Sequence, residues 1–345
     1  MNENILIVNV NWIGDVLFTT PFIRAVREAH PDSYIACLLH PRCSEILTAN
    51  PRIDEVIIYD EEYEHRNIFG KLRLIRELRK RRFDTAFILH RSFTKALIAY
   101  LAGIKERIGY PTKKRSVLLT KSVEEPEAGT HKVEYFLNVA RAAGIPVGDN
   151  SYEFFVTDTD RDFAANLLHK SALGDEEALV ILCPGGNWDP KRWPKERFAL
   201  LANALIEKYR AKIMIAGSNK DIRLGEDIEK MMKNKPIIVC GKTTIKELGA
   251  LFERASLVVA NDTGPMHIAV AMKAPVIALF GPTSPAVTGP YGSGNYKVIF
   301  KNEDVSCEVP CYDVKCKDNR CMAAIKVEDV LAAADGMLTR RHTLY

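Results

Sequence analysis

The sequence predicts an α/β fold with two units of similar size, each built on a parallel sheet that helices cover on both faces. Short, near-continuous apolar runs alternate with amphipathic segments along the chain, which is the pattern of buried parallel strands and their connecting helices. A polar stretch at residues 156–178 interrupts this alternation, which then starts again. A chain of 345 residues is also long enough for two domains.

In the first unit, apolar runs of strand length are separated by segments with apolar residues at helical spacing. The expected strands cover residues 5–10, 34–39, 55–59 and 85–89. Helices are expected between them, for example over 22–30, 72–82 and 95–103. Strands that alternate with helices in this way predict a parallel sheet.

The second unit shows the same alternation, but no sequence repeat links it to the first. Its strands are expected at 179–183, 212–217, 236–240, 256–261 and 275–281, with helices in the gaps. We therefore expect one domain at 1–157, a second at 158–325, and a C-terminal helix and tail at 326–345. That last segment could pack against either unit, including back onto the first domain.

The net charge of +4 is mild, although the basic residues are unevenly distributed. A dedicated nucleic-acid-binding protein would carry a stronger and more clustered charge, so no nucleic-acid partner is expected. Seven Lys or Arg residues lie in 71–84 and five in 105–115. These two segments are either solvated faces or surfaces that contact an anionic partner, such as a membrane leaflet or a phosphorylated acceptor.

The chain is expected to be cytoplasmic and to lack a transmembrane segment. No apolar run approaches the roughly 20 residues that are needed to span a bilayer. The N-terminal residues have no basic region ahead of a long apolar core, so they do not read as a signal peptide.

Four of the eight cysteines, Cys307, Cys311, Cys316 and Cys321, cluster in one segment. In a cytosolic chain such a cluster points to a metal more than to disulfides. The gaps are looser than those of the usual zinc-binding pairs. Reduced cysteines that pack a loop are therefore favoured over a thiolate-bound metal. The other four cysteines are scattered, and most lie in or beside apolar runs, as expected for buried small residues.

Ligands of open parallel sheets bind at the carboxyl ends of the strands, so the segments that follow the strands are the candidates for chemistry. "PGGNWDPKRWP" (184–194) follows one strand of the second unit. Gly185 and Gly186 allow the backbone to approach a ligand closely. Lys191 and Arg192 supply two cations in the same loop. This combination favours a diphosphate ligand over a plain surface loop that two tryptophans anchor.

"NDTGPMH" (261–267) follows another strand of the second unit, at the start of a helix. Thr263 and Gly264 supply a hydroxyl and backbone N–H groups at the helix N-terminus, where anions bind readily. Asp262 or Thr263 could instead simply cap the helix. This segment alone does not decide between the two interpretations.

Other common ligand motifs are absent from the sequence. No GxGxxG follows a strand, and no GxxxxGK[ST], GxSxG or HExxH occurs. A nicotinamide-dependent dehydrogenase and a P-loop kinase are therefore not expected. In the first unit, "NWIGDVLFTTP" (11–21) follows the first strand, and its Asp15 is either a helix cap or a catalytic group.

Several of these segments together resemble glycosyltransferase family 9, the lipopolysaccharide heptosyltransferases. They are "WIGDVLFTTPFIRAVREAHP", "PGGNWDPKRWP", "GSNKD", "NDTGPMHIAVAMKAPVIALFGPTSP" and "PCYDVKC" with "RCM", in this order. The resemblance covers about residues 4–335. It is closest to the second heptosyltransferases, through "GPTSP" and the cysteine-rich tail.

The resemblance implies the GT-B fold, in which two Rossmann-like domains face each other across a cleft. It implies that the first domain binds the lipid A–core acceptor and that the second binds ADP-heptose. L-glycero-D-manno-heptose would be transferred with inversion to an α-linkage, and ADP would be released. No cofactor or catalytic metal would be required. The enzyme would be a monomer, peripheral to the cytoplasmic face of the inner membrane.

The roles implied by the resemblance fall on matching positions of this sequence. Asp15 matches the catalytic base, Lys191 the lysine that binds the donor phosphate, and Asp262 the acid that recognises the heptose hydroxyls. Thr263 and Gly264 match the residues that hold the diphosphate, and we expect Gly185 and Gly186 to approach the same ligand. Less specific matches are the nucleoside contacts Ser218, Asp221 and Thr243. Arg91, Ser92 and Thr94 follow an expected strand of the first unit, and from that position we expect them to face the acceptor. The loop "PGGNWDPKRWP" departs from the family's common "PGAEFGPAKRWP".

Two other functions are compatible with the same architecture. One is a different GT-B enzyme, either another sugar transferase or a nucleotide-sugar epimerase. An epimerase would need further acid–base residues in the cleft, and no paired carboxylates indicate them. The other is a non-catalytic relative that binds nucleotide sugars. Loss of Asp15 or Lys191 would have supported it, but both are present.

Overall fold

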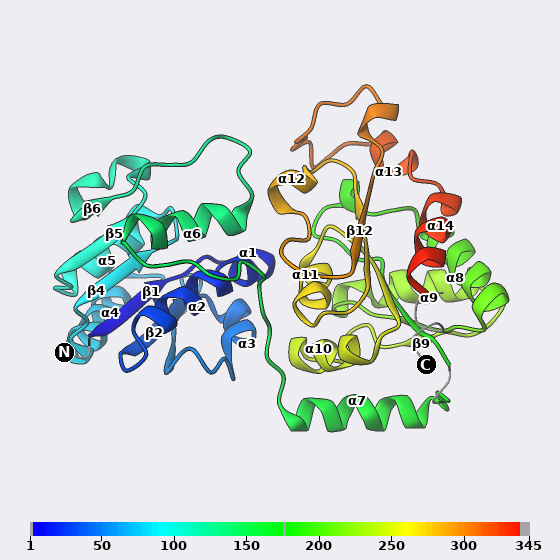
Figure 1. Ribbon diagram of the computed structural model, residues 1–345, viewed down its shortest axis with the longest axis horizontal. Helices are drawn as coiled ribbons and strands as arrows, with labels where there is room; N and C mark the ends of the chain where they lie inside the picture. The colour runs from blue at the N-terminus through cyan, green and yellow to red at the C-terminus, as the bar shows by residue number, and fades with distance from the viewer. Residues whose placement is uncertain (1–2, 175–176, 339–345) are drawn as a thin grey trace. The chain divides into compact units, whose positions relative to one another are not determined.

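The computed structural model describes residues 3–174 and 177–338. The chain divides into two compact units, Met1–Phe155 and Val156–Tyr345, shown in Figure 1. The division lies within two residues of the position expected from the polar stretch. Each unit is described separately below.

The first unit contains a six-stranded, wholly parallel sheet with the order β3-β2-β1-β4-β5-β6. Its strands are β1 (Asn4–Val8), β2 (Tyr34–Leu39), β3 (Glu55–Ile58), β4 (Thr85–Ile88), β5 (Glu106–Gly109) and β6 (Lys121–Ser122). Its α-helices are α1 (Ile13–Phe18), α2 (Thr20–Ala29), α3 (Ser44–Leu47), α4 (Ile68–Arg81), α5 (Phe93–Leu101) and α6 (Lys132–Ala142). Short 3₁₀ turns are η1 (Pro41–Cys43), η2 (Thr112–Lys114) and η3 (Ser116–Leu118).

Helices cover both faces of this sheet, as its apolar strands require. Helices α4 and α5 pack on one face, and α1, α2 and α6 pack together on the other (Figure 1). Four of the five residues of β1 are fully buried, because both faces of the strand are covered. Val8 pairs with Leu38 and Ile88, so β1, β2 and β4 end at the same edge of the sheet.

The second unit has another six-stranded parallel sheet, with the order β12-β11-β10-β7-β8-β9. Its strands are β7 (Leu179–Cys183), β8 (Lys212–Ile215), β9 (Ile237–Ile238), β10 (Leu257–Asn261), β11 (Val276–Phe280) and β12 (Tyr296–Phe300). Its α-helices are α7 (Asp158–Lys170), α8 (Lys195–Tyr209), α9 (Ile222–Met231), α10 (Ile245–Arg254), α11 (Gly264–Ala271), α12 (Pro285–Thr288), α13 (Arg320–Ala323) and α14 (Val327–Leu338). The 3₁₀ turns are η4 (Asp189–Lys191), η5 (Asn219–Asp221) and η6 (Asn302–Asp304).

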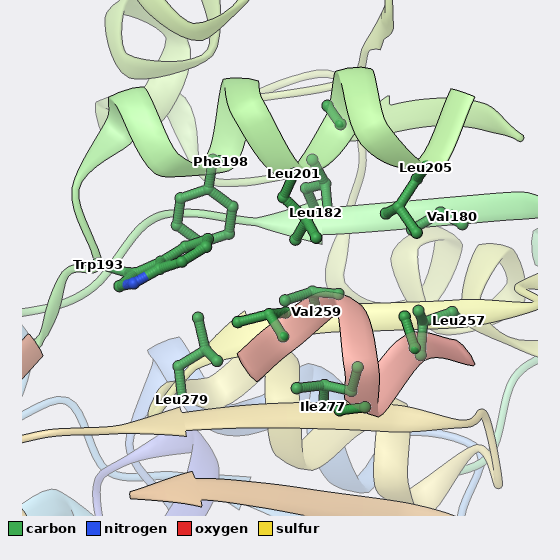
Figure 2. Close-up of a cluster of buried hydrophobic side chains, with 14 of the residues drawn as sticks. Val180, Leu182, Trp193, Phe198, Leu201, Leu205, Leu257, Val259, Ile277 and Leu279 are labelled. Atoms are coloured by element: carbon green, nitrogen blue, oxygen red, sulfur yellow. The ribbon is translucent and has the colours of Figure 1, made fainter. Parts of the chain in front are cut away.

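The core on one face of this sheet is formed by α8, α9 and α14. Figure 2 shows Phe198, Leu201 and Leu205 of α8 pointing toward the side chains of β7. Trp193 lies in the same cluster, and its indole N–H donates to the carbonyl of Ile325 at 2.9 Å. The loop after β7 is therefore fixed by a buried aromatic anchor.

The last helix, α14, belongs to the second unit. It packs against α8 and against β10, β11 and β12. Its buried residues, including Val330, Ala333 and Ala334, are part of the same core as Leu201 and Leu205. Of the two packing arrangements expected for segment 326–345, the described residues 326–338 therefore show the one on the second unit. Residues 339–345 lie outside the described part of the chain.

Truncation of Leu201 to alanine should lower the free energy of unfolding by about 2–5 kcal/mol, the usual cost of a cavity in a packed core. Its neighbour Leu200 is 58% exposed, whereas Leu201 is fully buried. Leu200→Ala is thus a matched control that should change the stability by about 0.5 kcal/mol or less. Urea unfolding of both variants measures the difference, and equal losses would contradict this packing of α8.

Within residues 3–174 and 177–338, no helix is both long and apolar enough to cross a membrane.

Candidate active site

In both sheets the candidate residues follow the strands at which the strand order reverses. In the first unit, β1 lies between β2 and β4; in the second, β7 lies between β8 and β10. The connections leaving such a strand and its neighbour diverge to opposite faces, which opens a crevice at the carboxyl edge. Asp15 follows β1, Lys191 follows β7, and Asp262 follows β10. The topology therefore predicts a ligand site at this edge of each sheet.

Asp15 lies in the first turn of α1 and is partly exposed. The N-cap residue of this helix is Trp12, and its side chain makes no capping hydrogen bond. Asp15 is thus the third helical residue and not the cap itself. A carboxylate in the first turn is stabilised by the helix dipole, by about 0.3–1 kcal/mol at an exposed site. This position is compatible with a catalytic role.

A buried lysine ties the turn before Asp15 to the neighbouring strand connection. Lys95, on α5, is only 1% exposed. Its ammonium group donates to Asn11 Oδ1 at 2.6 Å and to the carbonyl of Asn9 at 3.4 Å. It lies 3.8 Å from Glu61, which itself accepts from Asn11 Nδ2 at 2.9 Å. Lys95 therefore holds the loop that leads into α1, a role that the sequence did not reveal.

Burial lowers the pKa of Lys95 to about 8 from its ordinary value of 10.5. The unfolded chain therefore binds more protons than the folded chain between about pH 8 and pH 10.5, and the stability contributed by this site rises with pH across that window. Relative to Lys95→Met, the wild type should gain about 3 kcal/mol from the lower to the upper limit. Urea unfolding of both proteins across this range measures the gain.

Lys95→Arg provides the control for this prediction. Arginine keeps its charge throughout the range, and methionine has none, so neither variant titrates at this position. The difference between the wild type and each variant should therefore have the same slope with pH. A difference that stays flat would contradict a depressed lysine pKa.

The three predicted acceptor residues lie on the same carboxyl edge of the first sheet, directly after β4. Arg91 is exposed and pairs with Glu125 at 3.4 Å. Ser92 is the N-cap of α5, and its backbone N–H donates to His90 Nδ1 at 3.0 Å. Thr94 is partly exposed in the first turn of α5. Burial lowers the pKa of His90 to about 3, so this ring remains a neutral acceptor at physiological pH.

In the second unit, Lys191 and Asp262 form a tight, mostly buried ion pair. Lys191 Nζ lies 2.6 Å from Asp262 Oδ2, and the two side chains are 17% and 6% exposed. Thr283 Oγ1 donates to the same carboxylate oxygen at 2.7 Å, and His267 Nε2 lies 3.9 Å from the other. Residues 71 positions apart in sequence are thereby brought together. Thr283 and His267 are functional candidates that the sequence motifs alone did not indicate.

The loop that carries Lys191 is fixed to the end of β10 by the fully buried Asn261. Asn261 Nδ2 donates to the carbonyls of Pro184 and Gly185 at 2.8 and 3.1 Å. Its Oδ1 accepts from the backbone N–H of Trp193 at 3.1 Å. One amide side chain therefore holds both ends of the loop in register with the strand beside it.

Gly186 brings this loop next to Thr263. A Cβ atom at Gly186 would lie 3.3 Å from Arg192 Cγ and 3.6 Å from Thr263 Cγ2. Thr263 is the N-cap of α11, its side chain makes no capping hydrogen bond, and Oγ1 donates to the carbonyl of Asn261 at 3.2 Å. The first N–H groups of a helix have no intrahelical acceptor, so those of Thr263 and Gly264 are positioned for an anion. The structure thus brings together Gly186, Lys191, Asp262, Thr263 and Gly264.

The predicted nucleoside residues follow β8 and β9, on the other side of β7. Asp221 is buried, and its Oδ2 accepts from the N–H and the hydroxyl of Ser218 at 2.8 and 2.7 Å, which forms a capping box. A Cβ atom at Gly185 would lie 2.6 Å from Asp221 Oδ1. Asp221 therefore supports the glycine loop directly. Thr243 is partly exposed, next to Thr244, the N-cap of α10.

The four clustered cysteines line one small cavity, together with Asp313 and Asp318. Burial raises the pKa of the Cys321 thiol, which favours the protonated form. In the described part of the chain, no group of three or more His, Cys, Asp or Glu side chains is arranged to hold a metal ion. The remaining cysteines, Cys37, Cys43, Cys183 and Cys240, are buried, as the apolar context of most of them predicts.

Comparison with known proteins identifies the family. Glycosyltransferase family 9 (heptosyltransferase) matches residues 71–317, well over half of the chain. Lipopolysaccharide heptosyltransferase 2 of Escherichia coli K12 is 28% identical over 299 residues, which cover 83% of this chain and 85% of the relative.

Two solved structures have the same fold. A family 9 glycosyltransferase from Veillonella parvula superposes with a TM-score of 0.89 at 26% identity, covering 99% of this chain and 98% of the other. The E. coli ADP-heptose LPS heptosyltransferase II superposes with a TM-score of 0.83 at 24% identity, covering 99% and 100%. The two sheets and their helices match the GT-B architecture. The chain belongs to glycosyltransferase family 9 and is a glycosyltransferase.

Proposed function

We propose that this enzyme transfers heptose from ADP-L-glycero-D-manno-heptose to the inner core of lipopolysaccharide, with inversion at the anomeric carbon. The observation that carries the proposal is the Lys191–Asp262 ion pair at the carboxyl edge of the second sheet, which follows β7 and β10 and adjoins the N-terminus of α11. The names of its relatives, which specify heptose, lipopolysaccharide and ADP-heptose, support this choice of substrates.

The diphosphate of the donor would bind between Gly185, Gly186, Lys191, Thr263 and Gly264. The ammonium group of Lys191 has three N–H donors, one of which Asp262 occupies, so the others remain for phosphate oxygens. The N–H groups at the start of α11 add a partial positive charge. Negative charge grows on ADP as the glycosidic bond breaks, and these groups would stabilise it in the transition state.

Asp262 would orient the heptose. Two donors, from Lys191 and Thr283, already hold one of its oxygens, which fixes the direction of the carboxylate. Its other oxygen can accept hydrogen bonds from sugar hydroxyls, since a carboxylate has about four acceptor sites. A carboxylate whose orientation is fixed in this way can select a sugar by the positions of its hydroxyls.

Asp15 would act as the general base in the acceptor domain. A sugar hydroxyl is a weak nucleophile until a base accepts its proton during the attack. An aspartate is a weak base, so its effect depends on a position about 3 Å from the acceptor oxygen. The proton moves to the Asp15 carboxylate, the acceptor oxygen bonds to the anomeric carbon, and the electron pair of the broken bond leaves with ADP. No second catalytic carboxylate is needed, unlike in glycosidases.

Arg91, Ser92 and Thr94 follow the neighbouring strand and would contact the acceptor, the lipid A–core. This acceptor is anionic and membrane-bound, so the enzyme would work at the cytoplasmic face of the inner membrane as a peripheral monomer. The basic segments of the first unit match the charge of such a partner.

A donor panel tests the proposal. Titration calorimetry with ADP-heptose, UDP-glucose and GDP-mannose should show ADP-heptose binding at least about tenfold tighter than either, a preference of about 1.4 kcal/mol. Tighter binding of a UDP or GDP sugar would contradict the proposed donor and favour another GT-B transferase. Conversion of the nucleotide sugar without an acceptor would instead indicate an epimerase.

A further inference from the structure

Helix α5 has an apolar outer face. Phe93, Tyr100 and Leu101 are 42%, 49% and 38% exposed, and spacings of seven and eight residues place them on one side of the helix. Over the described residues Phe93–Leu101, the only charged side chain is Lys95, which points into the protein and is buried. A surface helix normally carries polar side chains on its outer face. This helix therefore lacks the charged outer face that a surface helix usually has.

Elements packed against α5 add more exposed apolar side chains. Helix α4 and η3 both contact α5. Phe69 and Leu72 on α4 are 75% and 38% exposed, and Val117 on η3 is 81% exposed. We call the six residues Phe69, Leu72, Phe93, Tyr100, Leu101 and Val117 the α5 patch. Isolated exposed apolar residues are ordinary, but a group on three adjoining elements indicates an interaction surface.

Cationic side chains border the α5 patch on both sides. On α4, Arg73, Arg76, Arg79 and Lys80 are exposed. Beyond α5, Lys105, Lys113 and Lys114 are exposed. The basic segments 71–84 and 105–115, separate in sequence, thus lie on either side of one helix.

Two contacts join this border directly to the patch. Arg79 Nε donates to the carbonyl of Leu101 at 2.9 Å. The guanidinium of Arg107 lies 5.2 Å from the centre of the Tyr100 ring. Cationic and apolar groups therefore form one continuous surface at the C-terminal end of α5.

Acidic side chains at this border are fewer. Glu64 pairs with Arg73 at 3.3 Å, while Glu77 lies on α4 and Glu106 on β5. They leave an excess of exposed positive charge around the patch. The surface therefore favours an anionic partner.

We propose that the α5 patch and its cationic border form the surface by which the enzyme docks on an anionic lipid bilayer. Apolar and aromatic side chains can enter the interface between headgroups and acyl chains, while lysine and arginine contact lipid phosphates. Each Lys or Arg near an anionic leaflet strengthens the partition by about fivefold. Several such residues beside a shallow apolar surface give reversible, peripheral binding.

The charge distribution argues against a second copy of this chain as the partner. A two-fold symmetric contact through the α5 patch would place the same surface on both sides. The cationic border of one copy would then meet that of the other, and like charges oppose such a contact. A bilayer with anionic headgroups has the complementary sign.

This inference rests on the part of the proposed function that places the enzyme at a membrane, and it adds the surface that contacts the bilayer. It does not depend on which sugar is transferred. Vesicle binding is measured without donor or acceptor. Failure of the docking surface is therefore distinguishable from failure of the heptosyltransferase assignment.

Co-sedimentation of the full chain with phosphatidylglycerol-containing vesicles tests the proposal. The wild type should bind these vesicles and not pure phosphatidylcholine vesicles. Arg76→Gln with Lys80→Gln should weaken binding by about 25-fold, since each lost cation costs about fivefold. Tyr100→Ser with Leu101→Ser should weaken it by about tenfold through lost apolar contact.

Matched variants on the second unit serve as controls. Lys233→Gln with Lys235→Gln removes two exposed cations, and Leu200→Ser with Met231→Ser removes two exposed apolar side chains. Both should bind vesicles like the wild type. Equal loss in control and patch variants would overturn the proposal, as would equal binding to neutral vesicles. Analytical ultracentrifugation tests the alternative of a dimer. If the wild type forms a dimer that Tyr100→Ser with Leu101→Ser abolishes, and does not bind vesicles, the α5 patch is an interface between copies and the proposal is overturned.

Discussion

Replacement of Asp15 by asparagine should lower kcat by about 10²–10⁴-fold, the usual contribution of a positioned general base. Asparagine keeps the size of the side chain but cannot accept the proton of the acceptor hydroxyl. The affinity for ADP should change little, because the proposed diphosphate contacts lie in the second unit. Initial rates of ADP release, combined with calorimetry of ADP binding, measure both quantities.

Asp32→Asn is a control for this substitution. Asp32 is an exposed acid in the turn between α2 and β2, so it precedes a strand and does not follow one. It should retain full activity. If Asp15→Asn had the kcat of the wild type, Asp15 would not be the general base. A parallel loss of ADP binding would indicate a folding defect instead of a lost base.

Lys191→Ala should weaken ADP binding by about 10–150-fold, which corresponds to the roughly 1.5–3 kcal/mol of a charge-assisted hydrogen bond. The substitution also leaves Asp262, which is 6% exposed, without its cation. An uncompensated carboxylate would repel the diphosphate, so both effects act in the same direction. Calorimetry of ADP binding measures the total.

A second variant separates these two effects. If Lys191 acts only by neutralising Asp262, adding Asp262→Asn to Lys191→Ala should restore ADP affinity. If Lys191 contacts phosphate directly, as we expect, the double variant should remain weak. Lys195→Gln is the matched control, because Lys195 pairs with Asp227 and not with the site. Unchanged ADP affinity in Lys191→Ala would contradict the phosphate role.

The sequence predicted the fold well because the strands are nearly continuous apolar runs. Each expected strand exists, and the residues that follow β1, β7 and β10 lie where parallel-sheet topology places them. The pairing of Lys191 with Asp262 follows from β7 and β10 being neighbours. That adjacency is a tertiary property, because two other strands, β8 and β9, lie between β7 and β10 in the sequence.

The exposure of the basic residues was predicted less well, because the sequence shows where charged residues occur but not which partners they contact. Arg115 was counted as surface charge, yet it is fully buried, and Nε donates to the carbonyl of Tyr110 at 2.7 Å. Arg81 pairs with Glu55 at 2.6 Å. Lys95 lies in a segment with helical periodicity, where a single lysine is typical of a solvated face. Only the packing of α5 against the β1 turn shows that it is buried.

Transfer of heptose from ADP-heptose to the lipopolysaccharide inner core is the activity that we propose for this enzyme. The most direct measurement is the mass of a defined inner-core acceptor after incubation with the wild type and each of several nucleotide sugars. We expect the acceptor to gain one heptosyl residue with ADP-heptose alone, and we expect Asp15→Asn to give almost no product in the same time. Transfer of a different sugar would contradict this function. An acceptor that stays unmodified with ADP-heptose and a folded wild-type enzyme that binds ADP would contradict it as well.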